Sequence, residues 1–267
     1  MFKELSFLGF FLILTLLVCL NTATTAAFDE LEMQYLNEIT ATAKKYEHIY
    51  PIDPLFVLAV IKAESGFYRW AISSRGAAGP AQLMPQVAKD LGMRVYLPPW
   101  YEKALKRIRL AEAHSKEARK RLAKISYKKS LKENKRLAME AIQDLILADR
   151  YRQEANEIFK RYKATLLKKV RGKDDRELTG IDERFIVSKA INACIMLLTE
   201  SAKSLGRDLR VLASAYNAGP TRVIEAGGIP FLEETVAFQN RVMNFYKEYL
   251  KKKKLEGRDG DLYDATR

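Results

Sequence analysis

The feature that most restricts how this chain can fold is a stretch of about seventy residues, from Trp100 to Val170, rich in Ala, Lys, Arg, Glu and Leu. Apolar residues recur in it every three or four positions, the period of a helix with one buried face. The pattern predicts helices at about 100–129 and 132–170, joined as an antiparallel hairpin by a turn near 130–134. One continuous coiled-coil helix is the alternative. The predicted buried face of the second helix comprises Ala138, Ala141, Leu145, Ala148, Tyr151, Ala155, Ile158, Tyr162 and Leu166.

The segments that flank this stretch also have helical patterns, and no strand-like alternation of useful length occurs. We therefore expect a mainly α-helical fold. Further helices are predicted at about 186–205, 209–216 and 235–249, with Gly206 closing the first of these. The chain is divided into a signal peptide (1–27), a first compact part (28–93), a basic helical insertion (94–184), a second compact part (185–250) and a charged flexible tail (251–267).

The N-terminal segment has the pattern of an export signal. Lys3 precedes an almost wholly apolar run, residues 5–20, and small residues follow it up to Ala27. We expect cleavage near Ala26 or Ala27 and a location in the periplasm or cell envelope. An uncleaved anchor is the alternative, and it is the only route to membrane association that we expect. Cleavage would leave Cys194 as the one cysteine, so the core must stabilise the fold without a disulfide.

The positive charge is concentrated in the insertion. The whole chain has a net charge of +13, and residues 94–184 hold 26 Lys/Arg against 14 Asp/Glu. Nucleic acid is not an expected partner, because the chain is exported and its aromatic residues are not interleaved for base stacking. The insertion could be a solvated hairpin, a wall of a binding groove, a clamp on acidic polymers or a docking arm for a protein partner. We hypothesise that it regulates access or recruits a partner.

The first compact part contains an apolar helix that ends in a carboxylate. Asp53 and Pro54 suit an N-cap and a first helical position, and residues 54–63 are apolar nearly all round, which predicts burial. Glu64 ends this run. Burial raises a carboxyl pKa, and a carboxyl that is still protonated near neutral pH can act as a general acid toward a glycosidic oxygen. Asp29, Glu30, Glu32 and Glu38, by contrast, have the pattern of solvated surface charges.

A glycine-containing turn follows Glu64 and supplies candidate ligand contacts. Gly76 and Gly79 allow close backbone approach, and Gln82 could bond a sugar acetamide or hydroxyl. A helix is predicted over residues 82–91, with Gly92 as its stop. Tyr216, far downstream, could bring a hydroxyl to the carboxyl. The chain has only two histidines and no metal-ligand or phosphate-loop spacing, so we expect no metal site and no cofactor.

Several separated motifs resemble the catalytic signature of the soluble-type lytic transglycosylases, which have a goose-lysozyme-like fold. The first group lies within residues 64–92, and the later motifs lie within 182–184, 213–220, 228–230 and 234–235, in the family's order. The resemblance covers about half of the chain. It implies a lysozyme-like helical catalytic domain with a long helical insertion. The first group consists of Glu64-Ser65, Ala71-Ile-Ser73, Gly76-Ala77, Gly79, Gln82, Met84-Pro85, Ala88 and Leu91-Gly92.

The resemblance implies cleavage of peptidoglycan glycan strands between N-acetylmuramic acid and N-acetylglucosamine. Glu64 would be the sole catalytic carboxylate, first acid and then base, and the product would carry a 1,6-anhydro end. Hydrolysis of the same bond by water and a non-catalytic peptidoglycan-binding scaffold are the alternatives. The residues implied to line the sugar groove are Ser65, Ser73, Gln82, Met84 and Tyr216, with Asn217 shaping its wall.

Two positions depart from the family pattern. This chain has Gly79-Pro-Ala-Gln82 where Gly-Leu-Met-Gln is usual, so one subsite is expected to be wider. It has Phe238 where a tyrosine is usual, which removes a hydroxyl that the family places near the site. The family's short link between its two halves is here about ninety residues long.

Overall fold

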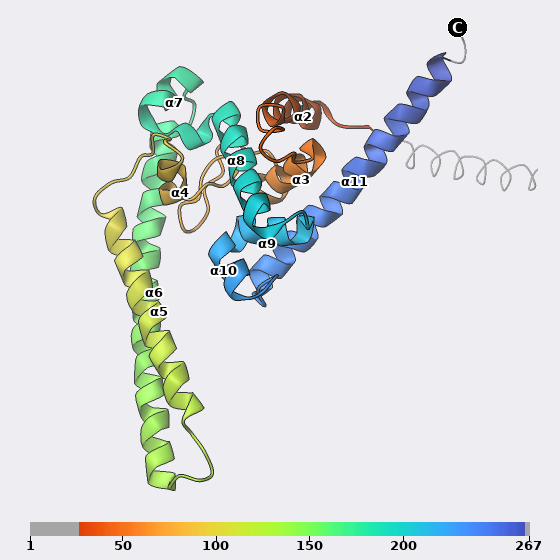
Figure 1. The fold of residues 1–267 in the computed structure, drawn as a ribbon. Helices are drawn as coiled ribbons and strands as arrows, with labels where there is room; N and C mark the ends of the chain where they lie inside the picture. The colour runs from red at the N-terminus through yellow and green to blue at the C-terminus, as the bar shows by residue number, and fades with distance from the viewer. Residues whose placement is uncertain (1–26, 265–267) are drawn as a thin grey trace, which may run out of the picture. The chain divides into compact units, whose positions relative to one another are not determined.

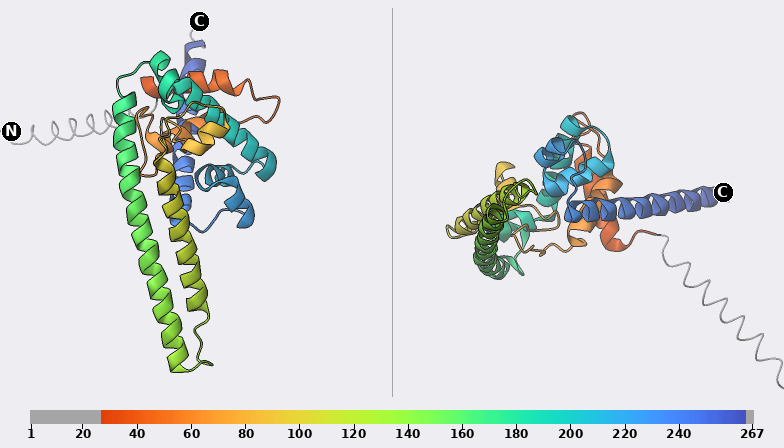
Figure 2. Two further views of the ribbon diagram at one scale, coloured as in Figure 1. Left: turned by 90° about the vertical axis from the view of Figure 1, so that its left-hand side faces the viewer. Right: turned by 90° about the horizontal axis from the view of Figure 1, so that it is seen from below.

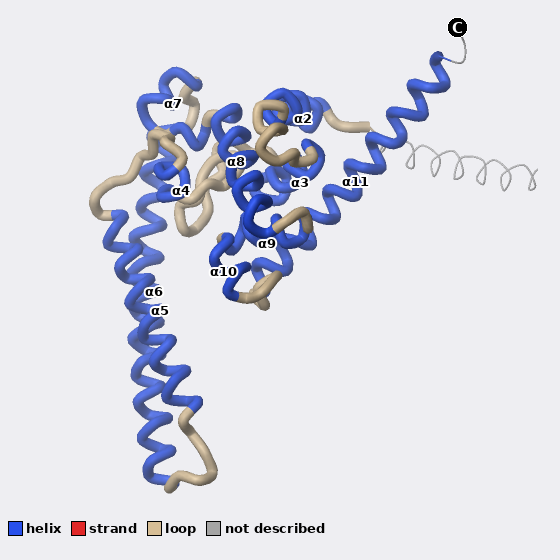
Figure 3. Tube along the Cα trace, viewed as in Figure 1, coloured by secondary structure: helices blue, strands red, loops and turns tan. Residues whose placement is uncertain are grey.

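The computed structural model describes residues 27–264, and it is built from helices and loops (Figures 1 and 3). The predicted export signal, apart from Ala27, lies outside these residues. Within 27–264 there is no strand, only isolated bridges in one loop, and no helix is both long and apolar enough to cross a membrane. The helices are α2 (Glu30–Ala43), α3 (Pro54–Ser65), α4 (Pro85–Asp90), α5 (Tyr101–Ala123), α6 (Leu131–Val170), α7 (Asp175–Ile181), the 3-10 helix η1 (Glu183–Phe185), α8 (Val187–Leu205), α9 (Leu209–Ala218), α10 (Pro220–Glu225) and α11 (Glu233–Asp264).

The described residues form two compact units. One comprises the chain up to Ala63 together with the chain from Cys194 onward, and the other comprises Glu64–Ala193. The boundaries fall inside α3 and α8, so each of these helices contributes to both units. We refer to them as the terminal unit and the hairpin unit.

The terminal unit is organised around α3. Asp53 Oδ1 accepts the Leu55 N–H at 2.9 Å, and Pro54 begins the helix, as the sequence predicts. Every residue from Leu55 to Ile61 is at most 3% exposed, which confirms the expected buried helix. Tyr246 of α11 donates its hydroxyl to the second oxygen of Asp53 at 2.6 Å. The N-terminal end of α3 is therefore held by its own cap and by the last helix.

Glu32 in α2 is buried, at only 1% exposed, whereas its sequence pattern predicts a solvated surface charge. Its carboxylate forms ion pairs with Lys62 Nζ at 2.6 Å and Lys252 Nζ at 2.5 Å. It also accepts a hydrogen bond from the Tyr249 hydroxyl at 3.1 Å. Burial alone would raise the pKa of Glu32, but these donors and the Asp29 N–H hold it at about 2. The ammonium groups that pair with Glu32 come from α3 and α11, which periodicity within α2 cannot reveal.

The last helix is longer than predicted. We expected it to end at Tyr249 and a charged tail to begin at Lys251, but α11 is helical up to Asp264. Lysine and glutamate are good helix formers, and the first glycine within the helix is Gly257. Lys252 contributes as well, because its contact with Glu32 anchors the first turn beyond Tyr249.

The hairpin unit contains α5 and α6, which run side by side as an antiparallel pair (Figure 2). This confirms the predicted hairpin over the single-helix alternative. Alanines recur every seven residues along the contact faces of both helices and are at most 1% exposed. Small side chains at this spacing let two helices pack closely along a constant seam. The seam alanines are Ala104, Ala111 and Ala118 of α5 and Ala141, Ala148 and Ala155 of α6.

The root of the hairpin belongs to the main hydrophobic core of its unit. Tyr101 of α5 and Phe159 and Tyr162 of α6 pack there with Ile72, Ala78 and Phe185, which lie outside the hairpin. The predicted face of α6 is right for most positions and wrong at Leu145, which is 44% exposed, while Leu137 and Phe159 are buried instead. The root and residues 64–97 therefore share one core.

The helix that we predicted over residues 82–91 starts three residues later, since α4 comprises Pro85–Asp90. Gln82 has a φ of +47°, which a right-handed helix does not allow, and Met84 is extended. Pro85 occupies the first helical position, where a residue without an N–H is tolerated best. Gly92, with φ of +78°, follows the helix as predicted.

Candidate functional site

Glu64 and Ser65 lie in the last turn of α3, and both are partly buried. The helix stops because Gly66 and Phe67 have φ angles of +59° and +67°. A positive φ is ordinary for glycine but strained for an aromatic residue, and such strain is found most often at functional sites. Glu64 is thus presented at the end of a rigid, buried helix, next to a sharp reversal of the chain.

The turn that carries Gln82 is held by its own backbone. Ala78 and Leu83 exchange N–H···O bonds of 3.1 Å in both directions, and the Gly79 N–H donates to Ala71 O at 2.9 Å. Gln82 Nε2 donates to Ala71 O at 3.1 Å and to Gly79 O at 2.9 Å. Since both amide hydrogens bond the backbone, a sugar hydroxyl or amide N–H would meet Gln82 at its Oε1. The positive φ of Gln82 is a second strained position in the candidate site.

Ser73 and Met84 lie at the two ends of the same turn. Ser73 Oγ accepts the N–H groups of Arg75 and Ala77 at 3.3 and 3.0 Å, so it stabilises the turn and keeps its own O–H for donation. Met84 is 37% exposed at the start of α4. The hairpin unit thus brings Ser73, Gln82 and Met84 together on one loop.

Gly79 cannot carry a side chain, because a Cβ there would come within 1.8 Å of Arg184 O. The expected close approach is therefore made to a backbone segment within the same unit. The φ of Gly79 is +79°, which independently disfavours other residues.

Arg184 is fully buried and hydrogen-bonds the backbone of the turn that carries Gln82, a role that the sequence did not predict. Its guanidinium donates to Gly76 O at 2.8 Å and Leu83 O at 3.1 Å, and it forms a bidentate pair with Asp182 at 2.8 and 2.9 Å. Burial would lower the pKa of Arg184, but the contacts with Asp182 and Tyr162 raise it, so the group stays charged. The backbone on both sides of the Gln82 turn, at Gly76 and at Leu83, is thus fixed to one buried cation.

Tyr162 connects the hairpin to this cation. Arg184 Nη2 donates to the Tyr162 hydroxyl at 2.9 Å, and the hydroxyl donates to Tyr96 O at 2.9 Å. Burial raises the pKa of Tyr162, which keeps its proton available for that bond. The sequence contains one signal for this role: Tyr162 occupies the next seven-residue step after Ala141, Ala148 and Ala155, where a small residue would continue the seam.

Tyr216 and Asn217 belong to the terminal unit, near the end of α9. Both are partly buried, and the Thr235 hydroxyl of α11 donates to Asn217 Oδ1 at 3.0 Å. Thr235 is 2% exposed, so this bond fixes the Asn217 side chain. Phe238, where the family has a tyrosine, is also 2% exposed.

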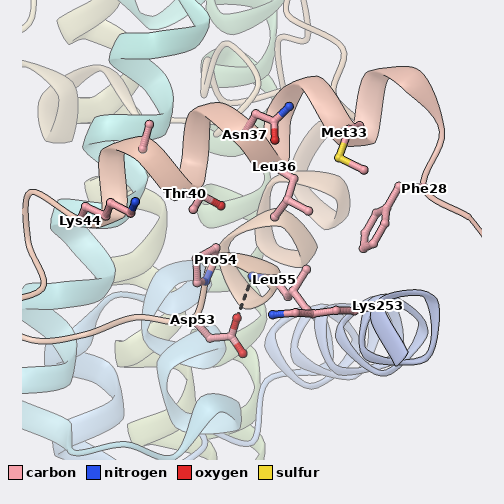
Figure 4. A pocket seen from close by; sticks show the side chains of 11 residues that line it. Phe28, Met33, Leu36, Asn37, Thr40, Lys44, Asp53, Pro54, Leu55 and Lys253 are labelled. Carbon is pink, nitrogen blue, oxygen red and sulfur yellow. Dashed lines mark hydrogen bonds between the residues drawn. The ribbon is translucent and has the colours of Figure 1, made fainter. Parts of the chain in front are cut away.

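Two further findings bear on ligands. Within residues 27–264 no group of three or more His, Cys, Asp or Glu side chains is arranged to hold a metal ion. A cavity of 480 Å³ lies in the terminal unit between α2, the start of α3 and α11, with Leu36, Thr40, Pro54 and Lys253 among its lining residues (Figure 4). No predicted site residue lines it.

These features define a class: a helical domain with a long helical insertion, which is lysozyme-like by its match to a family model. Residues 41–109 match the family model described as the Transglycosylase SLT domain, which confirms the resemblance to the lytic transglycosylases. The match contains α3, the Gln82 turn, α4 and the first residues of α5, and it covers about a quarter of the chain. It indicates a transglycosylase-type enzyme whose substrate is peptidoglycan. No solved structure matches the chain.

Proposed function

We propose that this protein is a lytic transglycosylase that cleaves the bond between N-acetylmuramic acid and N-acetylglucosamine with Glu64 as its acid and base. One observation carries the proposal. Inside the segment that matches the family model, a partly buried glutamate ends a rigid apolar helix and is followed by the strained turn that carries Gln82. The first step needs a carboxyl that can give a proton to the glycosidic oxygen, and a glutamate in this position supplies one.

In the proposed reaction Glu64 gives its proton to the glycosidic oxygen as the bond from that oxygen to the anomeric carbon breaks. The resulting carboxylate then takes the proton of the muramyl 6-hydroxyl, whose oxygen bonds to the anomeric carbon. Glu64 ends protonated, and the muramyl residue ends as a 1,6-anhydro sugar. One carboxylate suffices because the nucleophile, the muramyl 6-hydroxyl, belongs to the substrate, whereas most glycosidases use two carboxylates.

The other predicted residues are assigned to substrate binding. Gln82 would accept from a sugar hydroxyl or acetamide N–H through Oε1, and Ser73 would donate its hydroxyl. Ser65, Met84 and Tyr216 would line the groove. Asn217, with its oxygen bonded by Thr235, would shape a wall. The enzyme would act after export, in the periplasm or cell envelope, where peptidoglycan is found.

Digestion of purified sacculi, with mass spectrometry of the released fragments, tests the proposal. The wild type should release fragments with anhydro ends, and Glu64→Gln should reduce the rate by at least about a hundredfold. Glu47→Gln is the matched control, because Glu47 is an exposed carboxylate within the matched segment. Fragments heavier by one water would instead identify a muramidase. Release of nothing by the wild type would favour a non-catalytic scaffold.

A further inference from the structure

The distal half of α6 carries a second apolar face that packs against nothing described. Leu131, Met139, Ile142 and Ile146 are 85%, 55%, 53% and 63% exposed. Their spacing places them on one side of the helix, about a third of a turn away from the seam alanines. We call these four residues the distal stripe. On the same side of the helix, closer to the root, the exposed residues are polar, as at Gln153 and Lys160.

The loop at the end of the hairpin extends this apolar surface. Tyr127 is 91% exposed, and Ile125 and Leu122 beside it are 40% and 45% exposed. Nine of the eighteen large hydrophobic residues that are exposed among the described ones lie within residues 122–147. Such a concentration marks an interaction surface rather than the scattered apolar exposure that is normal for proteins. Figure 1 shows this loop at the end of the hairpin opposite to α4 and α7.

Lysine and arginine outnumber the acids around this surface by six to three. Residues 124–136 contain six Lys/Arg and a single acid, Glu133, which pairs with Lys129 at 3.1 Å. The other two acids within residues 122–147 are also paired: Glu140 with Arg136 and Arg121, and Asp144 with His114 and Arg121. Lys132, beside the distal stripe, and Lys135, which lies within it between Leu131 and Met139, have no ion pair among the described side chains. The surface is therefore apolar, with unneutralised lysines within it and beside it.

We propose that residues 122–147 form a docking surface for an anionic phospholipid membrane. A second copy of the chain fits less well, because two stripes placed together in parallel would bring like charges into contact. The apolar residues continue around a loop at the end of the hairpin, so a deformable layer can cover them without a matching groove. Tyrosine favours the headgroup region, and lysine can reach the headgroups while its methylenes stay among apolar groups. Each lysine near an anionic surface adds further attraction.

Tryptophan fluorescence of the full chain with Tyr127→Trp tests the location of the tip directly. Vesicles should be about one third phosphatidylglycerol in phosphatidylcholine, with and without brominated acyl chains. We expect a blue shift and about twofold quenching by the brominated lipid, because the new side chain would enter the interface. The wild type corrects for Trp70 and Trp100, and Gln153→Trp, on the same side of α6 but nearer the root, should show neither change. Any contribution of the N-terminal segment to binding is common to all variants.

The expected quenching should fall to background in the added variant L131S/I142S/I146S, and should weaken with K132Q/K135Q or with higher salt. These exposed side chains make no core contact, so unchanged circular dichroism is expected for both variants. The proposal is overturned if quenching is absent, if phosphatidylcholine alone gives the same quenching, or if the serine variant is quenched as before. It is also overturned if sedimentation reveals a dimer that the serine variant abolishes, since the stripe would then join two copies. None of these outcomes depends on Glu64.

Discussion

The two ends of α6 have the same helical geometry and opposite surroundings. Near the root, Phe159, Tyr162 and Leu166 are at most 2% exposed and share a core with residues outside the hairpin. Near the tip, only the seam with α5 is covered, and the distal stripe is exposed. An insertion therefore need not be a separable module. Its root is part of the structure that holds the Gln82 turn, whereas its tip contributes nothing to that turn.

The largest difference between the root and the tip of the hairpin is expected from deletions. Removal of residues 96–180 should abolish folding, because it deletes Tyr101, Phe159 and Tyr162 from the core. Each such loss costs about 3–5 kcal/mol, against a total stability of about 5–15 kcal/mol. Replacing residues 113–149 by a short glycine turn should keep the fold and the cleavage of sacculi, as measured by thermal melting and by fragment release. A cooperative melt of the longer deletion would refute the shared core.

Arg184→Met should have the next largest effect. It leaves the carboxylate of Asp182 buried without its cation and removes donors from Gly76 O and Leu83 O, so we expect a loss of about 3–5 kcal/mol in urea unfolding. Adding Asp182→Asn should restore part of that loss, since it removes the uncompensated charge. A loss below about 1 kcal/mol would mean that the turn is held by its own backbone alone.

Tyr162→Phe isolates the single hydroxyl that links the hairpin to Arg184. We expect a loss of about 1–2 kcal/mol, together with faster amide hydrogen exchange in the Gly76–Leu83 turn. Tyr151→Phe is the matched control nearer the tip, where the ring stacks on His114, and it should change stability by less than about 0.5 kcal/mol. Equal effects of the two substitutions would contradict the distinction between root and tip.

The smallest effect is expected from an ion pair of the hairpin surface. Arg150 and Glu154 are one helical turn apart at 3.2 Å, with side chains 73% and 35% exposed. Arg150→Gln should cost about 0.5 kcal/mol or less, and the difference should vanish in high salt. A cost comparable to that of Arg184→Met would show that exposed pairs stabilise this hairpin as strongly as its buried root does.

Local signals in the sequence predicted the elements well. Asp53 and Pro54 gave the start of α3, the apolar period gave the hairpin, and Gly92 and Gly206 gave two helix ends. The motif around Glu64 and Gln82 was sufficient to indicate the family, since the family match covers that segment. These successes share a cause: each depends on residues that are close in sequence.

The failures involve partners that are distant in sequence. The sequence around Glu32 has the pattern of a surface acid, and only the fold reveals its ion pair with Lys252. Tyr162 has the spacing of a seam residue, and only the fold reveals its hydrogen bond with Arg184. The start of α4 was missed for a local reason, because the left-handed backbone of Gln82 is not what a glutamine usually adopts. Tertiary contacts, rather than local propensity, determine the surroundings of Glu32 and Tyr162.

The seam alanines have a consequence for how the length of the hairpin can change. Because Ala104, Ala111 and Ala118 repeat every seven residues opposite Ala141, Ala148 and Ala155, inserting or removing seven residues in both helices preserves the register. Each step would move the tip by about 10 Å while leaving the root untouched. The hairpin can therefore be lengthened or shortened in seven-residue steps, by evolution or by design, without a new core.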